Sequence, residues 1–193
     1  MRGVSDANLE QFPVEKVSWE DVQQFLRRLN AREGESGIRY RLPSGLEWEY
    51  ACRGGATSRE ECAFDFYLAQ PANDLSSEQA NFDGNHPAGK APAGQYRERT
   101  TKVGSYTPNR LGLYDMHGNV WEWCEDWYGV YPSAPVSDPL GPSEGSRRVD
   151  RGGGWDIDAG YCRAANRSGF PPDYRDSDLG FRLARVPVEV GGK

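Results

Sequence analysis

The sequence predicts an α+β protein with two helices near the N-terminus, followed by short antiparallel strands and long loops. Two helix start signals occur in the first 55 residues, and alternating apolar residues later in the chain indicate short strands. The 23 Gly and 13 Pro among 193 residues interrupt long helices and long strands. The chain also carries 6 Trp, 10 Tyr and 7 Phe, which favours a folded core over disorder. A chain of this length is expected to form one domain.

The first helix is expected to begin after Ser18. The Ser18 hydroxyl can cap the helix while Asp21, three residues on, reaches back to the Ser18 backbone as in a capping box. Val17 and Val22 have the spacing of a hydrophobic staple. One apolar face then follows at helical spacing: Val22, Phe25, Leu26 and Leu29.

The second helix is expected to begin after Ser44, because Glu47 completes an S-x-x-E capping box. It carries Leu46, Trp48, Tyr50 and Ala51 and is expected to end at Gly54-Gly55. Capping and a solvated face explain Glu47 and Glu49 better than an acid/base pair does.

The rest of the chain is expected to be loops and short strands. Residues 56–110 and 129–146 are rich in Pro, Gly and Ser. Alternation predicts strands over Asn119–Trp123, Val149–Trp155 and Gly180–Val186. The same alternation favours core packing over a sugar-binding platform for the tryptophans of this region, Trp121, Trp123 and Trp127.

Charge and cysteine usage exclude several classes of protein. The chain has 23 Lys and Arg against 29 Asp and Glu, and no basic stripe of the kind that binds nucleic acid. No apolar run is long enough to span a membrane. The N-terminus lacks a hydrophobic signal stretch, so a cytoplasmic protein is the default expectation. The cysteines lack C-x-x-C spacing, which favours reduced thiols over zinc ligands and leaves two disulfides open: Cys52, Cys62, Cys124 and Cys162.

Several long motifs resemble those of one family. Residues 41–51 read RLPSGLEWEYA, and NRLGLYDM, GNVWEW, RGGGW and LGFRL follow in order. The set is similar to the formylglycine-generating enzyme superfamily, also known as sulfatase-modifying factor domains, whose RLPTEAEWEYA and RGGSW motifs it approaches. The resemblance covers residues 13–186, with 1–12 as an N-terminal extension and 187–193 as a tail. It implies a variant of the C-type lectin fold.

The resemblance does not settle the activity. Sulfatase-activating members bind copper(I) through a cysteine pair near the C-terminal motif and oxidise a protein cysteine, and soft thiolates suit that metal. The matching stretch here holds Cys162 with no second thiol within ten residues, so no catalytic residue is expected unless Cys124 approaches Cys162 in space. A catalytically inactive relative stays an alternative. The iron-dependent branch needs a histidine cluster, whereas this chain has only two histidines.

The segment from Asp156 to Asp178 has an unusual composition, because it contains no Lys, Glu, Gln, Met or Trp. Asparagine codons mutated at adenines by diversity-generating retroelements cannot yield these five types. The stretch 151–182 thus resembles the variable region of retroelement target proteins, which use the same fold to display a ligand-binding face. The alternative is an ordinary acidic loop. The expected scaffold positions are Trp155, Arg163, Ala165, Arg167, Arg175, Leu179, Gly180 and Phe181.

The resemblance implies a hypervariable face for a protein or other macromolecular ligand. Rigid aromatics with small polar residues are typical of such faces, and the aspartates favour basic or hydrogen-bond-donating ligands. The expected ligand-binding residues are Asp156, Ile157, Asp158, Gly160, Tyr161, Ser168, Gly169, Phe170, Pro171, Tyr174, Asp176, Ser177 and Asp178.

A calcium site is a further expectation. Five residues resemble the family's calcium-binding loops and offer the oxygen donors that hard cations prefer: Asn81, Asp83, Asn119, Val120 and Glu122. Turn-capping side chains are the alternative interpretation of the same residues. The ligand-binding function itself requires no cofactor.

Overall fold

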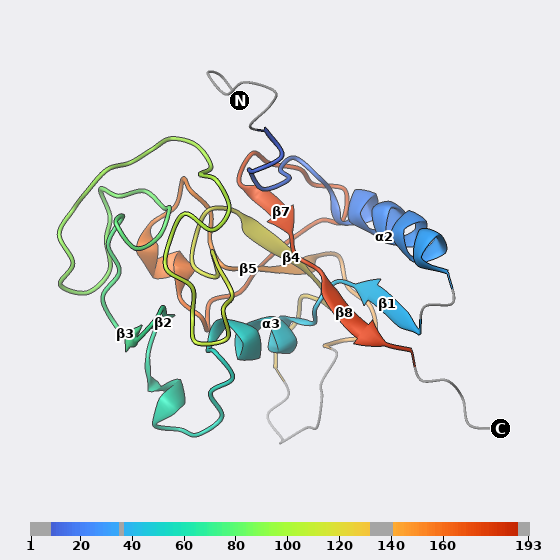
Figure 1. The fold of residues 1–193 in the computed structure, drawn as a ribbon, viewed down its shortest axis with the longest axis horizontal. Helices are drawn as coiled ribbons and strands as arrows, with labels where there is room; N and C mark the ends of the chain where they lie inside the picture. The colour runs from blue at the N-terminus through green and yellow to red at the C-terminus, as the bar shows by residue number, and fades with distance from the viewer. Residues whose placement is uncertain (1–8, 35–36, 132–140, 189–193) are drawn as a thin grey trace.

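The computed structural model describes residues 9–34, 37–131 and 141–188. The expected extension 1–12, loop 129–146 and tail 187–193 fall partly outside these residues. The described elements confirm the α+β class (Figure 1). They are α2 (Trp19–Glu33), β1 (Ile38–Arg41), α3 (Gly45–Cys52), the 3-10 turn Glu61–Ala63, β2 (Phe66–Tyr67), β3 (Pro71–Ala72), β4 (Trp121–Trp127), β5 (Arg148–Arg151), the 3-10 turn Ala159–Cys162, β6 (Ser168–Phe170), β7 (Leu179–Phe181) and β8 (Ala184–Pro187).

The first helix, α2, begins where its capping box predicts. Ser18 Oγ accepts a hydrogen bond from Asp21 N (3.1 Å), and Asp21 Oδ2 accepts one from Ser18 N (3.0 Å). Val22 and Leu26 are buried in the core. Phe25 departs from the expected apolar face, because it is 44% exposed. Its ring packs at a tilt against Phe181, with centroids 5.7 Å apart.

The second helix, α3, also has its capping box. Ser44 Oγ accepts from Glu47 N, and Glu47 Oε2 accepts from Ser44 N. The helix ends at Cys52, two residues before the glycine pair. Trp48 and Cys52 point into the core, while Tyr50 is 53% exposed. Local hydrogen bonds between residues three apart therefore position both helices as the sequence indicates.

A four-stranded sheet in the order β6-β5-β4-β7 lies at the centre of the fold (Figure 1). Its pairs are antiparallel except β4 and β7, which run parallel. The strand expected at Asn119–Trp123 begins two residues later, because Asn119 has a φ of 73°, and it continues to Trp127. The strand expected to reach Trp155 ends at Arg151, since Gly152 follows with a φ of 96°.

The strand expected over Gly180–Val186 is instead two strands in different sheets. Its first part is β7 of the central sheet, and its second part is β8, which pairs antiparallel with β1. On the other edge of β1, Asn30 of α2 bonds the Tyr40 backbone twice: its Nδ2 donates to Tyr40 O (2.8 Å) and its Oδ1 accepts from Tyr40 N (2.7 Å). The side chain of Asn30 thereby satisfies backbone groups that a further strand would otherwise bond.

Among the residues that the structure describes, buried side chains form three hydrophobic clusters. Trp48 and Cys52 of α3 pack with Cys124 in the first cluster, which lies beneath α3. Trp121 and Trp123 lie between the sheet and α2, so they are core residues as predicted. Trp127, the third tryptophan of that prediction, is only partly buried and lies under the guanidinium group of Arg148. Phe66, Phe82, Ala159 and Cys162 form the third cluster, under the long loops. Within the described part of the chain, no helix is both long enough and apolar enough to cross a membrane.

Candidate functional site

Residues 156–178, the segment expected to bind ligand, have little regular secondary structure, and a few buried residues anchor them in the core. Ala159, Cys162 and Ala164 have no exposed surface, and Leu179 closes the segment in the core. Gly153 is required at its start, because its φ is 81° and a Cβ there would lie 2.5 Å from Cys162 Sγ. These contacts place the first part of the segment, with the 3-10 turn Ala159–Cys162, beside the long loops (Figure 1).

The expected ligand-binding residues fall into three groups by exposure. Asp156, Asp158, Gly160, Tyr161 and Pro171 are exposed. A second group is partly exposed: Ile157, Ser168, Phe170, Tyr174, Asp176 and Ser177. Gly169 and Asp178 are buried. Three expected scaffold residues, Arg163, Ala165 and Arg175, are exposed, so the division into scaffold and face does not follow exposure alone.

A cleft of about 800 Å³ opens beside the exposed group. Two backbone hydrogen bonds hold its sides together, from Asp83 N to Ile157 O (3.0 Å) and from Ala159 N to His86 O (3.1 Å). One side is the loop 85–89; the other is formed by Asp158, Gly160, Tyr161, Arg163 and Asn166. The loop is a part of the site that sequence reasoning missed, because no local pattern relates it to residues 158–166.

Next to this cleft, Asp83, His86 and Asp158 bring potential metal-ligand atoms within 4.8 Å of one another. Only Asp83 belongs to the calcium prediction. Its Oδ1 accepts hydrogen bonds from the backbone N (3.0 Å) and side-chain Nδ2 (2.8 Å) of Asn85, as in an Asx turn.

The oxygen donors of the expected calcium site have other partners in this structure. Both carboxylate oxygens of Glu122 accept from Arg182, and Oε2 also accepts from Trp48 Nε1 (2.6 Å). Asn119 Oδ1 accepts from Asn81 Nδ2 (3.1 Å) and from Thr101 N (2.9 Å). A calcium ion at these residues would have to displace those bonds.

The second half of the segment lies along the start of α2. Phe170 and Tyr174 stack with ring centroids 4.5 Å apart. Tyr174 donates from its hydroxyl to Asp176 Oδ2 (2.6 Å), and this bond, with the charge of Asp176, raises the pKa of Tyr174 to about 12. Arg175 donates to Asp21 Oδ2 (2.8 Å), a contact that lowers the pKa of Asp21 to about 2. The capping residue of α2 therefore also holds this segment in place.

Asp156 and Asp178 connect the two halves. Asp178 is only 8% exposed, and the charge of Asp156 acts on its carboxyl. Burial, followed by the charge of Asp156, raises the pKa of Asp178 to about 8. Beside them Tyr96 stacks on Trp155, with centroids 6.3 Å apart. Tyr96, far away in sequence, is a second neighbour of the site that no local signal identifies.

The cysteines do not form the pair that the copper-oxidase alternative needs. All four are free thiols, as the sequence favoured. Cys162 packs with Phe66 and Phe82, whereas Cys124 packs in the cluster beneath α3. Burial raises the pKa of both thiols well above the ordinary value, so neither readily forms a thiolate. The described residues therefore do not fit a two-thiolate copper(I) centre at Cys162.

His117 lies behind Cys162 and has a structural role. Its Nδ1 is 2.7 Å from Cys162 O, and its Nε2 accepts from Tyr67 N (2.8 Å). Nδ1 must therefore carry the proton. Burial lowers the pKa of His117 to about 4, which keeps the ring neutral. These contacts make His117 a neutral hydrogen-bonding residue of the core.

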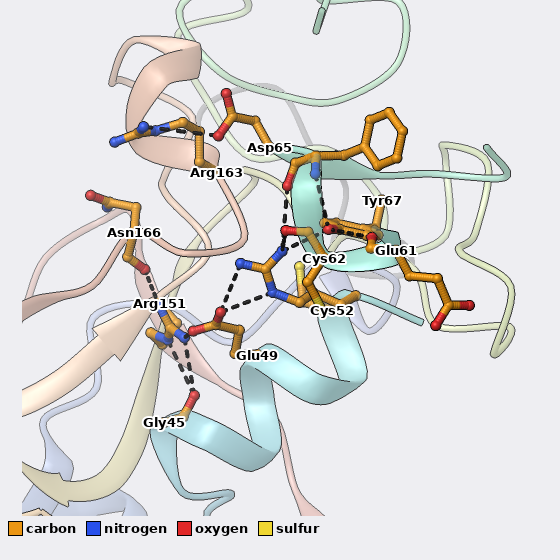
Figure 2. Close-up of polar contacts among 12 residues, drawn as sticks. Gly45, Glu49, Cys52, Glu61, Cys62, Asp65, Tyr67, Arg151, Arg163 and Asn166 are labelled. Atoms are coloured by element: carbon orange, nitrogen blue, oxygen red, sulfur yellow. Dashed lines mark hydrogen bonds and ion pairs between the residues drawn. The ribbon is translucent and has the colours of Figure 1, made fainter. Parts of the chain in front are cut away.

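A buried arginine network fixes the base of the segment to the scaffold (Figure 2). The Arg151 side chain is fully buried; its Nη2 bonds Glu49 of α3, and its Nη1 donates to Asn166 O at the rim of the cleft. Glu49 also accepts from Arg53 Nε (2.9 Å). Figure 2 shows Arg163 and Asp65 facing each other above this network, 3.9 Å apart. Glu49 is thus a structural ion-pair partner rather than part of an acid/base pair.

Known proteins are similar to this chain in sequence and in fold. The sulfatase-modifying factor enzyme 1-like domain matches residues 2–187. A formylglycine-generating enzyme of Streptomyces coelicolor is 37% identical over 177 residues, covering 89% of this chain and 52% of that protein. This chain spans about half the length of such relatives, since it covers 44% of the mouse enzyme.

Two solved structures are similar in fold. Treponema denticola variable protein 1 has a TM-score of 0.71 and 26% identity, with 97% of this chain and 74% of that chain covered. PvdO from Pseudomonas aeruginosa has a TM-score of 0.70 and 29% identity, with 91% and 62% covered. With the motifs and the fold in agreement, the chain belongs to the formylglycine-generating enzyme family of sulfatase-modifying factor domains.

Proposed function

We propose that this chain binds a protein or other macromolecular ligand through residues 156–178, and that a diversity-generating retroelement diversifies this face. The observation that carries the proposal is the separation of exposed from anchoring residues. The residues bordering the cleft point outward, whereas Ala159, Cys162 and Ala164 between them are fully buried. Such a segment can change its surface while its backbone keeps the same buried contacts. Similarity to a variable protein of known structure supports this function.

A combined variant tests the proposal. Asp156, Asp158, Gly160, Tyr161 and Pro171 are replaced together by residues reachable from asparagine codons, such as Asn, Ser and Ala. Because these positions are exposed, the melting temperature is expected to stay nearly unchanged, while the set of peptides selected from a display library changes. A matched variant with alanine or glycine changes at buried Cys162 and Ala164 should lose stability. Unfolding of the exposed-position variant would contradict the proposal.

A genomic observation tests the diversification separately. The locus is expected to hold a near-copy of the codons for residues 151–182, with AAC or AAT at the variable positions, next to a reverse transcriptase gene. A locus without such a copy would leave a ligand-binding face with no means of diversification, and would thus refute that half of the proposal.

A formylglycine-generating-type oxidase is the second candidate, favoured by the 37% identity to such an enzyme. A copper(I) titration of the full chain, compared with the Cys162→Ala variant, separates the two functions. Because Cys124 and Cys162 are buried in different clusters, we expect copper(I) to bind weakly and without a fixed stoichiometry. Tight binding at one copper per chain that Cys162→Ala abolishes would overturn the ligand-binding proposal.

A further inference from the structure

Two segments far apart in the sequence meet beside the cleft. Phe82 precedes Asp83 and Ala159 follows Asp158, and the side chains of Phe82 and Ala159 are fully buried in the same cluster under the long loops. The backbone bond from Ala159 N to His86 O (3.1 Å) joins the two segments directly. The core therefore fixes the backbone at three potential metal ligands, Asp83, His86 and Asp158.

The loop of residues 83–89, which carries two of these ligands, is held at both ends. At its start the chain passes closely over a neighbouring segment, because a Cβ at Gly84 would lie 2.3 Å from Gln95 O. At its end, Ala88 and Leu75 exchange two backbone hydrogen bonds (3.1 and 3.3 Å). Ligands on a backbone that is already positioned lose less conformational freedom when an ion binds.

The three side chains come close enough to share one ion. Each offers a ligand atom within 4.8 Å of the other two, and His86 Nε2 lies 3.9 Å from Asp83 Oδ2. Nitrogen and oxygen ligands lie about 2.1 Å from a tetrahedral zinc ion, and hence about 3.4 Å from one another. His86 and Asp158 are exposed, so rotation of their side chains can supply the remaining approach.

The two carboxyl groups of the cluster have no arginine or lysine partner among the described residues. Oδ2 of Asp83 faces only His86. The Asp158 carboxyl has neither a hydrogen bond nor an ion pair within the same part of the chain. Arg163, which lines the cleft beside them, pairs with Asp65 instead (3.9 Å). A divalent cation would supply the positive charge that the two carboxylates otherwise lack.

The donor atoms indicate the class of metal. One imidazole nitrogen with two carboxylate oxygens suits zinc and neighbouring divalent transition metals, whereas calcium and magnesium prefer oxygen ligands alone. Of the residues in the expected calcium site, only Asp83 takes part here, since Asn119 and Glu122 are bonded elsewhere. The cluster is therefore a separate site with a preference for a different class of ion.

The cluster also borders the cleft of about 800 Å³, because His86 and Asp158 line it. The Asp83 side chain lies deeper, with 18% of its surface exposed. Three protein ligands leave a tetrahedral ion with one further position, and this position is on the cleft side. Zinc sites with three protein ligands and one open position act on a bound molecule, whereas structural zinc sites are closed.

Building on the proposed ligand-binding face, we propose that Asp83, His86 and Asp158 bind a zinc ion whose fourth position takes a nitrogen or oxygen donor of the ligand. A histidine or an acidic side chain on the ligand supplies such a donor. The donor replaces a water molecule on the ion, the zinc stays divalent, and no covalent bond of the protein changes.

The site combines a fixed part of the fold with a proposed variable position. Asp83 and His86 lie outside residues 151–182, whereas Asp158 lies within them. Asparagine codons mutated at adenines can become codons for aspartate, histidine or cysteine, which all provide zinc ligands, and also codons for residues that do not. Zinc binding is therefore gained or lost with the residue at position 158, while the other two ligands stay in place.

Calorimetric titration of the full chain, freed of metals with a chelator, tests the proposal with the ion alone. We expect one Zn²⁺ per chain and weaker binding of Ca²⁺. His86→Ala and Asp158→Ala should each weaken zinc binding by about tenfold or more, because even the outer partners of metal ligands usually contribute that much. Asp158→His should retain binding. Asp173→Asn, which removes an exposed carboxylate of the same segment, is the matched control.

Nitrogen NMR of the imidazole rings shows whether His86 is a ligand. The chain has only two histidines, and both ring nitrogens of the buried His117 are bonded. Zinc should therefore shift the ring signals of His86 and leave those of His117 in place. The His86 side chain is 61% exposed, so His86→Ala should keep the melting temperature of the metal-free wild type.

Several results would overturn the proposal. They are no zinc binding, binding that persists in His86→Ala, binding that is lost in Cys62→Ser instead, and calcium binding as tight as that of zinc. The open position has its own test, in which Co²⁺ replaces zinc and imidazole is added at millimolar concentration. The visible absorption of the cobalt should change, and an unchanged spectrum would show that no position is open to a ligand.

The outcome is distinguishable from the failure of the proposed function. If substitutions at Gly160, Tyr161 and Pro171 change ligand selection while zinc does not bind, the face binds ligands without a metal. If those substitutions unfold the protein while zinc binds at His86, the metal site exists and the diversified face does not.

Discussion

Gly169 is expected to be fixed although it lies within the segment that resembles a variable region. A Cβ at residue 169 would lie 2.8 Å from Cγ of Tyr128, 2.9 Å from its Cβ and 3.0 Å from its Cδ2. Rotating the Tyr128 ring cannot relieve the contact with its Cβ, which is fixed to the backbone, and Arg167 lies over the ring at 4.6 Å. Gly169→Ala should therefore cost about 1–3 kcal/mol of unfolding free energy, as overpacking usually does. Each kcal/mol lowers Tm by about 2–4 °C in a domain of this size.

Gly160 provides the matched control from the same segment. A Cβ there has no heavy atom within 4 Å. Gly160→Ala should thus leave Tm unchanged or slightly raised, because the unfolded chain loses conformational freedom. Urea denaturation of both variants gives the difference, and Gly169→Ala in a Tyr128→Ala background should recover most of the loss. Equal stability of the two single variants would refute the packing argument.

Three further predictions concern stability. Burial raises the pKa of Asp150, which means that its contribution to stability is present at low pH and is lost as the pH rises above the ordinary aspartate pKa. The urea midpoint should therefore fall as the pH rises above about 4, the ordinary aspartate pKa, and Asp150→Asn should flatten that slope. Arg151→Met leaves Glu49 without its buried partner and should cost about 3–5 kcal/mol by urea denaturation. Ser44→Ala removes the cap that accepts from Glu47 N and should cost about 1 kcal/mol, seen as a lower Tm.

Features set by residues close in sequence are the ones that could be predicted. The capping boxes at Ser18 and Ser44 require only hydrogen bonds between residues that are three apart in the sequence, and both boxes are present. The parallel pairing of β4 with β7 and the division of Gly180–Val186 between two sheets depend on contacts between distant segments. Alternation within one segment carries no information about which sheet a strand joins.

The same limit applies to the site. Composition identified residues 156–178 as unusual, and exposure of Asp156, Asp158 and Tyr161 agrees with a surface role. The cleft, however, needs the loop 85–89, and Tyr96 approaches Trp155 from far along the chain. Neither contact has a signature in the sequence, because each depends on loops whose paths are fixed only by the whole fold.

Adenine mutagenesis of the codons and burial in the fold limit the residue types at the proposed variable positions in different ways. Adenine mutagenesis would alter residues 160, 169 and 178 alike, whereas the structure tolerates side chains of any size only at the first. At residue 169 the Tyr128 side chain leaves no room for a larger residue, and the side chain at residue 178 is only 8% exposed. If the face is diversified, folded variants should therefore be diverse at residue 160 and restricted at 169 and 178. A library randomised at the three positions is sequenced before and after selection for folding alone, which gives the diversity of amino acids that each position retains. Equal diversity at all three after selection would show that burial does not limit the face.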